Sequence, residues 1–231
     1  MIPTIEASPE ETYDIELEQT LLQANAKLAR ENRAQLDHYG ITAIDFMGAI
    51  GSGKTTLIAR MAGKLKDRLN LAVFNGDATT VDDVNLIAIQ GVPTVQLATI
   101  NGCHLDANLV GKAFLKIDLK KVDLIFIENI GNLICPAEFP LGSRSRVVVV
   151  SVTEGPYMVK KHPHMFLGAD IVVINKIDLA DAMGVKVESL VHDVHTLKPD
   201  IKVIPTSCKT GVGLDEVAAA LLAGKELHAD A

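Results

Sequence analysis

One stretch constrains this chain more than any other. The run from Gly48 to Thr55 fits the G-x-x-x-x-G-K-[ST] pattern of a phosphate-binding loop. An apolar, β-rich run over residues 41–47 precedes it, and apolar residues at helical spacing follow it over residues 56–65. Strand, glycine loop and helix is the order that the pattern requires. The stretch therefore predicts an α/β fold that binds phosphate rather than a chance glycine-rich turn.

The residue types in this loop suit a triphosphate. Glycines let the backbone curl until several N–H groups point at one phosphate, and the positive end of the following helix adds to the attraction. Lys54 is expected to reach the outer phosphates, and the Thr55 hydroxyl is expected to bind Mg²⁺. The predicted phosphate-binding residues are Gly48, Gly51, Ser52, Gly53, Lys54, Thr55 and Thr56.

Two later segments indicate that the base is guanine. Asn175-Lys176-Ile-Asp178 matches the N-K-x-D signature of GTP-binding domains and directly follows a predicted strand. A carboxylate at Asp178 can accept two hydrogen bonds from guanine, whereas adenine offers no such donor pair. Ser207-Cys208-Lys209 resembles the S-A-K loop that closes over the base in GTPases. Cys208 takes the place of the usual alanine and is expected to be a small buried side chain.

Magnesium also needs carboxylates from strand ends near the last phosphate. Asp77 and Glu128 are the candidates, because each follows an apolar strand. The D-x-x-G of Ras-like GTPases is missing, so slow turnover is expected; Gly131 of the run Glu128-Asn-Ile-Gly-Asn132 is a candidate backbone donor to the γ-phosphate. The predicted catalytic residues are Lys54, Thr55, Asp77 and Glu128.

Strands and helices alternate along the chain. A mainly parallel sheet of about seven strands, covered by helices on both faces, is therefore predicted. The strands are expected at residues 41–47, 71–75, 94–98, 122–128, 146–152, 171–174 and 202–205, and the helices at residues 14–38, 56–65, 82–90, 104–117, 181–197 and 214–222. The predicted organisation is a disordered tail over residues 1–13, a packed helix over 14–39, a GTPase domain over 40–224 and a tail over 225–231.

Composition excludes several classes of protein. The net charge of -7 argues against a nucleic-acid binder, which is usually basic. No apolar run approaches the roughly 20 residues of a membrane span, and the acidic N-terminus lacks a signal core, so a cytoplasmic protein is expected. The three cysteines, Cys103, Cys135 and Cys208, are too few for a disulfide scaffold and are expected to be free thiols or metal ligands.

Cys103-His104 and Cys135-Pro136 offer borderline-soft ligands. Thiolate and imidazole suit Zn²⁺, Ni²⁺ or copper, but three ligands are too few for a closed site unless a two-fold axis duplicates them. Free cysteines are more often small buried side chains, so from the residues alone both interpretations stay open. The short separation of Cys135 from Glu128 favours a metal that responds to the nucleotide.

Taken together, these motifs resemble the HypB family, the GTPases that help to insert nickel into [NiFe]-hydrogenase. The motifs that carry the resemblance are the glycine loop, Asn-Gly-Cys103-His104-Leu-Asp-Ala, Glu128-Asn-Ile-Gly-Asn-Leu-Ile-Cys135-Pro, Pro163-His164-Met-Phe and Ile-Asn175-Lys-Ile-Asp178. The family implies a three-layer P-loop NTPase of the SIMIBI class and a GTP-dependent homodimer. It also implies a HypA-type nickel chaperone and the hydrogenase large subunit as partners, with no nucleic acid or membrane.

The family further implies the two metal sites. Nickel or zinc would bind at the dimer interface through Cys103, His104 and Cys135, and magnesium through Thr55, Asp77 and Glu128. The chain departs from the family pattern in three places: residues 1–40 lack a Cys-x-x-Cys or His-rich nickel motif, residues 81–85 lack an arginine, and His162 stands where a tyrosine is common before Pro163. Three alternatives stay open: a UreG-type urease GTPase, a nucleotide-binding switch with negligible turnover, and a MinD-like ATPase.

Overall fold

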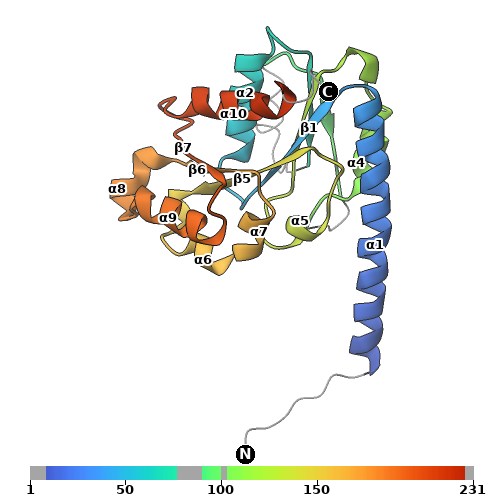
Figure 1. Cartoon of the computed structure of the whole chain (residues 1–231), viewed down its shortest axis with the longest axis horizontal. Helices are drawn as coiled ribbons and strands as arrows, with labels where there is room; N and C mark the ends of the chain where they lie inside the picture. Colours follow the sequence, from blue (N-terminus) through green and yellow to red (C-terminus); the bar gives the residue numbers. More distant parts are fainter. Residues whose placement is uncertain (1–8, 77–89, 100–102, 227–231) are drawn as a thin grey trace, which may run out of the picture.

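The computed structural model describes residues 9–76, 90–99 and 103–226, with side chains described within these ranges from residue 20 to residue 223 (Figure 1). A seven-stranded sheet forms the centre, in the order β3-β2-β4-β1-β5-β6-β7, and every neighbouring pair is parallel. The strands are β1 (Thr42–Met47), β2 (Leu71–Asn75), β3 (Thr94–Gln96), β4 (Leu124–Glu128), β5 (Ser145–Ser151), β6 (Ile171–Asn175) and β7 (Lys202–Pro205). The predicted fold class is confirmed.

Helices cover both faces of the sheet (Figure 1). The helices are α1 (Pro9–His38), α2 (Lys54–Leu65), α4 (Ala107–Phe114), α5 (Cys135–Glu138), α6 (Met158–Lys161), α7 (Pro163–Leu167), α8 (Ala180–Met183), α9 (Val187–Leu197) and α10 (Leu214–Glu226). Helices α2 and α10 lie on one face, while α1, α4 and the group α5 to α9 lie on the other. None of the described helices combines the length and the apolar character that crossing a membrane requires.

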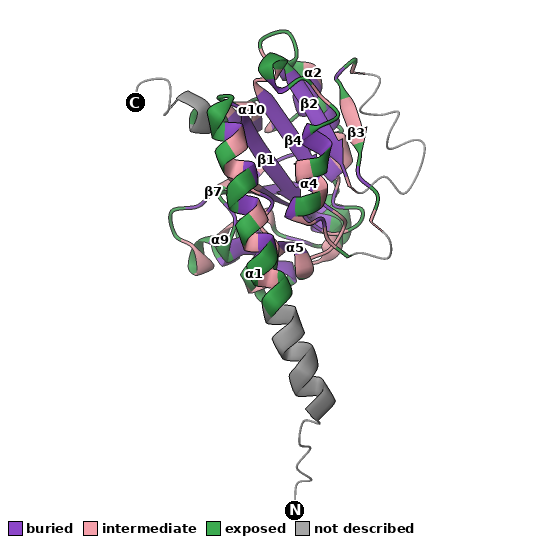
Figure 2. Cartoon of the chain, turned by 90° about the vertical axis from the view of Figure 1, so that its right-hand side faces the viewer, coloured by how far each residue is buried: buried purple, intermediate pink, exposed green. Residues whose placement is uncertain are grey.

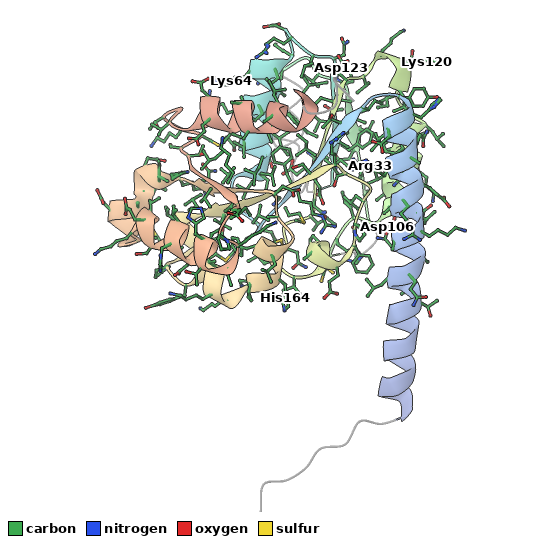
Figure 3. All side chains as sticks on the ribbon, viewed as in Figure 1. Arg33, Lys64, Asp106, Lys120, Asp123 and His164 are labelled. Carbon is green, nitrogen blue, oxygen red and sulfur yellow. The ribbon has the colours of Figure 1, made fainter. Side chains whose placement is uncertain are left out.

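The central strands are buried along their whole length (Figure 2). They therefore read as continuous apolar runs, which is typical of a sheet covered on both sides. Below α2 and α10, the rings of Phe46 and Phe126 meet edge to face at 5.2 Å, and Leu57 and Met61 of α2 are fully buried beside them. Lys64 of α2 pairs with Asp215 of α10 at 2.6 Å on the outer surface (Figure 3).

Two buried asparagines attach α1 to the domain. The Asn25 side chain accepts a hydrogen bond from the Ala107 amide at 2.8 Å and donates one to the Pro140 carbonyl at 2.9 Å. Asn32 donates to the carbonyls of Ala107 and Leu141. Since both asparagines satisfy backbone groups at the start of α4 and in the chain after α5, these hydrogen bonds hold α1 on the domain.

Several predicted helix bounds are wrong. Helix α1 begins at Pro9 rather than at residue 14, and α10 continues to Glu226 rather than ending at residue 222. The helix expected over residues 104–117 is the shorter α4, because the Asp106 side chain caps it by accepting from the Leu109 amide at 2.7 Å (Figure 3).

The helix expected over residues 181–197 is two helices. Gly184 ends α8 in the left-handed conformation, at φ 62°, and α9 starts afresh at Val187. Helices α5, α6 and α7 are too short to give a periodic signal and were not predicted. The helix expected over residues 82–90 lies outside the described residues except for its last position.

Candidate functional site

The phosphate loop connects β1 to α2 as predicted, and two of its glycines, Gly48 and Gly53, are needed for packing. Gly53 has φ 96°, and a Cβ built on it would lie 2.3 Å from Asn175 Nδ2. A Cβ on Gly48 would lie 2.1 Å from the Val149 carbonyl oxygen. Neither contact leaves room for a side chain. The loop is therefore pressed against β5 and against the end of β6, where the predicted nucleotide-binding residues Asn175, Lys176 and Asp178 begin.

Lys54 and Thr55 occupy the first turn of α2. The Lys54 ammonium group is almost fully buried and donates hydrogen bonds to the carbonyls of Gly48 and Ala49 at 3.3 and 3.1 Å. The Thr55 hydroxyl donates to Glu128 Oε1 at 2.5 Å, which confirms that these two predicted magnesium ligands lie together. Thr56 follows them, half-buried.

Glu128 is fully buried at the end of β4, where it pairs in register with Phe46 of β1 and Asn75 of β2. The Gly76 amide donates to the Glu128 carbonyl at 2.8 Å. Gly76, which directly follows β2, therefore lies beside the predicted magnesium site. Asp77 itself lies outside the described residues, so its predicted role stays a prediction.

The two segments predicted to recognise the base meet beside the phosphate loop. The Asn175 side chain donates to the Ser52 carbonyl at 3.0 Å, and the Lys176 ammonium donates to the Gly51 carbonyl at 2.6 Å. The Ser207 hydroxyl donates to Asp178 Oδ1 at 2.6 Å. The two motifs and the phosphate loop, which are far apart in sequence, therefore form one continuous surface, called here the nucleotide end.

Cys208 and Lys209 follow Ser207 in the loop after β7. Cys208 is buried, and its amide donates to Asn175 Oδ1 at 3.2 Å. Burial raises the pKa of the Cys208 thiol to about 11, which suits a small structural side chain and not a thiolate ligand. Lys209 is exposed at the rim.

The sequence motifs did not single out Glu154. It lies after β5, where it caps a short 3₁₀ helix over Val152–Glu154 by accepting from the Ser151 amide at 2.9 Å. Burial raises the pKa of its carboxyl group, and the positive charges of Lys54 and Lys176 act in the opposite direction. Glu154 is therefore a partly buried acid close enough to Lys54 and Lys176 for their charges to act on it. No sequence motif marks this residue; only the fold shows that it lies near these lysines.

The three predicted soft ligands lie together. One ligand atom from each of Cys103, His104 and Cys135 lies within 4.8 Å of the others, and Cys103 Sγ is 3.5 Å from His104 Nδ1. Cys103 and His104 precede α4 rather than starting a helix, which corrects that expectation. We call these three residues the metal cluster.

The chemistry of the cluster fits a borderline-soft divalent metal. A hydrogen bond with Cys135 raises the pKa of the Cys103 thiol, so a metal would have to displace a proton there. Burial lowers the pKa of His104, against the opposing charge of Asp106, which favours the neutral imidazole that can coordinate. The His104 ring stacks on Phe139 with centroids 3.7 Å apart. Three ligands leave at least one tetrahedral position for a partner or a water.

The metal cluster adjoins the phosphate loop. Gly48 forms an isolated antiparallel bridge with Asn132, and a Cβ on Gly131 would lie 2.4 Å from Ile50 Cγ1. The Asn132 side chain donates to the Cys103 carbonyl at 3.2 Å. Gly131 thus packs against the loop as a candidate switch requires. Asn132, Asn129 and Phe139 were not predicted, because their contacts come from segments that only the fold brings together.

Comparison with known proteins agrees with this geometry. The family model described as "CobW/HypB/UreG, nucleotide-binding domain" matches residues 42–205. The chain is 46% identical over 203 residues to the "Probable hydrogenase maturation factor HypB" of Methanocaldococcus jannaschii, covering 88% of this chain and 92% of that protein.

Solved structures give the same result. The hydrogenase maturation factor HypB of Archaeoglobus fulgidus superposes with a TM-score of 0.84 at 40% identity, covering 88% of this chain and 99% of that one. HypB of Helicobacter pylori, solved in complex with nickel, gives 0.82 at 34% identity, covering 88% and 95%. A LAO/AO transport system kinase gives 0.55 at 17% identity, covering 90% and 76%, and this likeness concerns the fold alone.

Proposed function

The chain belongs to the HypB family, and from this premise we propose that it is a GTP-hydrolysing metallochaperone that assists nickel insertion during [NiFe]-hydrogenase maturation. One observation carries the proposal: Asn132 contacts both the phosphate loop, at Gly48, and the metal cluster, at Cys103. A nucleotide site and a soft-metal site that share a segment suit a protein whose metal binding depends on the nucleotide.

The nucleotide end supports GTP hydrolysis through electrostatics. In this proposal, Lys54 stabilises the charge that develops on the transferring phosphoryl group, and Thr55, Glu128 and Asp77 hold magnesium. Magnesium would supply positive charge to the phosphate oxygens. Gly131, beside the loop, would donate its backbone N–H to the γ-phosphate.

Base selection is proposed to come from Asp178. Its carboxylate already accepts from Ser207, and its second oxygen remains available to guanine donors. Lys176 has φ 61°, an uncommon conformation for a residue other than glycine, and its side chain crosses to Gly51. The loop is thus fixed in place before the nucleotide arrives, which lowers the entropic cost of binding.

The cargo is proposed to be nickel, with zinc as the competing ion, bound by Cys103, His104 and Cys135. The nickel complex of the Helicobacter pylori relative supports this choice. A second copy of the chain would complete the coordination of the metal in a GTP-dependent homodimer. The proposed partners are a HypA-type nickel chaperone and the hydrogenase large subunit. The proposed compartment is the cytoplasm. A UreG-type role is less well supported, because the Cys-His and Cys-Pro pairs are separate in sequence and the relatives described above are HypB proteins.

The test is an exchange of base specificity. In Asp178→Asn, the carboxylate acceptor for guanine is lost, so GTP binding and phosphate release should fall by about 10⁴-fold. Xanthosine triphosphate, which offers an acceptor in place of the exocyclic amine, should restore both. Lys186→Ala, at an exposed position just before α9 and outside the predicted nucleotide-binding segments, is the control and should keep the preference for GTP. A protein that binds ATP and GTP equally, or an Asp178→Asn variant that still prefers GTP, would contradict the proposal.

A further inference from the structure

Two asparagines hold the metal-binding loop on both sides of His104. We propose that Asn129 and Asn132, called here the asparagine clamp, are positioning residues that make the nickel affinity depend on the bound nucleotide. The inference rests on the proposed function, because it assumes that the Cys103, His104 and Cys135 cluster binds nickel. It adds the residues through which the segment after Glu128 acts on that cluster.

The clamp acts on the two peptide groups that flank His104. The Asn132 side chain donates to the Cys103 carbonyl at 3.2 Å, and the Leu105 amide donates to Asn129 Oδ1 at 3.2 Å. Cys103 and His104 are joined by the first of these peptide groups, and His104 and Leu105 by the second. Both bonds together hold the backbone of His104, and thus the direction of the Cα–Cβ bond from which the imidazole extends.

Asn129 is fixed by the core. It is fully buried, its amide donates to the Phe46 carbonyl at 3.0 Å, and its side-chain nitrogen donates to Asp45 Oδ1 at 3.1 Å. Its side-chain oxygen is thereby directed to the amides of Leu105 and Ile130. The orientation of this side chain therefore depends on the register of β1 and β4, the two strands that frame the phosphate loop.

The Leu105 side chain makes a second connection to the nucleotide end. It is fully buried, and a Cβ built on Gly76 would lie 2.8 Å from both of its methyl carbons and 2.8 Å from the Glu128 carbonyl oxygen. The metal-binding loop thus packs tightly against the ends of β2 and β4, where the magnesium carboxylates are proposed to act. A close-packed contact of this kind transmits small displacements.

The third ligand lies on the same segment as the clamp. Cys135 begins α5, three residues after Asn132, and the Asn132 side-chain oxygen accepts from the Ile134 amide at 2.9 Å. Asn132 therefore touches the chain on both sides of the cluster, at Cys103 and next to Cys135. A displacement of residues 128–132 that follows the nucleotide would change the separation of these ligands, and with it the nickel affinity.

Asn132→Asp tests the clamp with little change of shape. The aspartate keeps an acceptor for the Ile134 amide but cannot donate to the Cys103 carbonyl. The measurement is the nickel dissociation constant of the full-length protein with GDP and with a non-hydrolysable GTP analogue. Wild type should show a ratio of at least about fivefold between the two states, and the variant a ratio near one. Asn132→Ala, which removes the same donor without adding a charge, should also give a ratio near one.

Asn25→Asp is the matched control. It also loses one donor, to the Pro140 carbonyl, and keeps one acceptor, for the Ala107 amide, but it lies on α1 and does not flank His104. It should keep the wild-type ratio. Asn129→Ala, which removes the other half of the clamp, should lower the ratio in the same direction as Asn132→Asp. Melting temperatures of the metal-free proteins report whether each variant folds.

The outcomes separate the two proposals. If wild type binds nickel with a nucleotide-dependent affinity and Asn132→Asp keeps the full ratio, the clamp is wrong and the proposed function stands. If Asn25→Asp also brings the ratio of the two nickel dissociation constants near one, the effect comes from a general loss of packing. The clamp is then also overturned. If wild type fails to bind nickel, or binds it equally in both states, the proposed coupling fails and the clamp fails with it.

Discussion

The nucleotide end and the metal cluster are built in different ways. At the nucleotide end, Lys54 is almost fully buried and most contacts of the side chains go to backbone carbonyls of residues 48–52. At the metal cluster, Cys103 is exposed, and the loop that carries it is attached through two asparagine side chains and one buried leucine. The first region is preformed by its own backbone, whereas the second depends on its neighbours.

This difference suits the two tasks proposed above, phosphoryl transfer and metal release. A phosphate site gains from donors that are fixed before the reaction, because no reorganisation is then needed in the transition state. A site that must release its metal gains from a loop whose position a neighbouring segment can change. The comparison predicts that changes at the nucleotide end abolish turnover, while changes at the metal cluster alter affinity in smaller steps.

The largest expected effect is at Lys54. Lys54→Ala removes the buried charge from the phosphate loop and should lower GTP turnover by about 10²–10³-fold. Nickel affinity in the absence of nucleotide should stay near wild type. Lys64→Ala, near the C-terminal end of α2, is the control, because the Lys64 ammonium group pairs with Asp215 on the outer surface. Phosphate release and nickel titration measure the two effects; a parallel loss of nickel binding would show that the two regions are not separately built.

The second effect concerns Asp45, which lies beneath Asn129 on the face of β1 that carries the metal cluster. Burial raises the pKa of its carboxyl group from 3.8 to about 6, although Arg146 and the Asn129 hydrogen bond oppose the shift. The folded-state pKa is raised, so the contribution to stability is complete below about pH 4 and is lost as the pH rises through 6.

Asp45→Asn should remove this dependence, because the amide oxygen can still accept from Asn129. The free energy of unfolding of wild type, relative to the variant, should fall by up to about 3 kcal/mol between pH 4 and pH 8. Denaturant titrations at the two pH values measure it. A difference that does not change with pH would mean that Asp45 is not buried as described.

The third effect is on metal affinity. Cys135→Ser replaces a thiolate by a harder and less acidic ligand, and should weaken nickel binding by about 10–100-fold. Cys208→Ala is the control, because Cys208 is buried in the core with α2 and α10, on the opposite face of the sheet from α4 and α5. It should leave nickel affinity unchanged. An equal loss of nickel affinity in both variants would show that nickel does not bind at the metal cluster.

The same contrast explains how much could be predicted from the sequence. The phosphate loop and residues 175–178 are contiguous motifs at strand ends, so their residue types alone predict both structure and role. The cluster of Cys103, His104 and Cys135 was predicted as an open alternative, and the resemblance to a family favoured it. The sequence also carried two local signals that were missed, the Asp106 cap and Gly184, and each explains a wrong helix bound.

What could not be predicted depends on long-range contacts. Asn129 reaches Asp45 across 84 positions and Leu105 across 24. The same residue types in an isolated segment are typical of a polar turn, since asparagine often bonds its own backbone. Only the parallel pairing of β1 with β4 brings these groups together.

The smallest expected effect would sharpen the comparison most. Phe139 stacks on His104 at 3.7 Å with an angle of 23° between the rings, and this contact restrains an imidazole that is otherwise partly exposed. Phe139→Leu keeps apolar bulk but loses the ring. An aromatic pair contributes about 0.5–1.5 kcal/mol beyond the area it buries, so nickel affinity should fall by about 2–10-fold.

Phe114→Leu is the matched control for Phe139→Leu. Phe114 tilts against Phe74 in the core at 5.8 Å, so its replacement should lower the melting temperature and leave nickel affinity unchanged. GTP turnover without metal should be the same in Phe139→Leu and wild type, because the stack does not touch the phosphate loop. If Phe139→Leu instead lowered turnover as Lys54→Ala is expected to, the metal cluster and the nucleotide end would be one rigid unit, and the difference in construction between them would have no functional meaning.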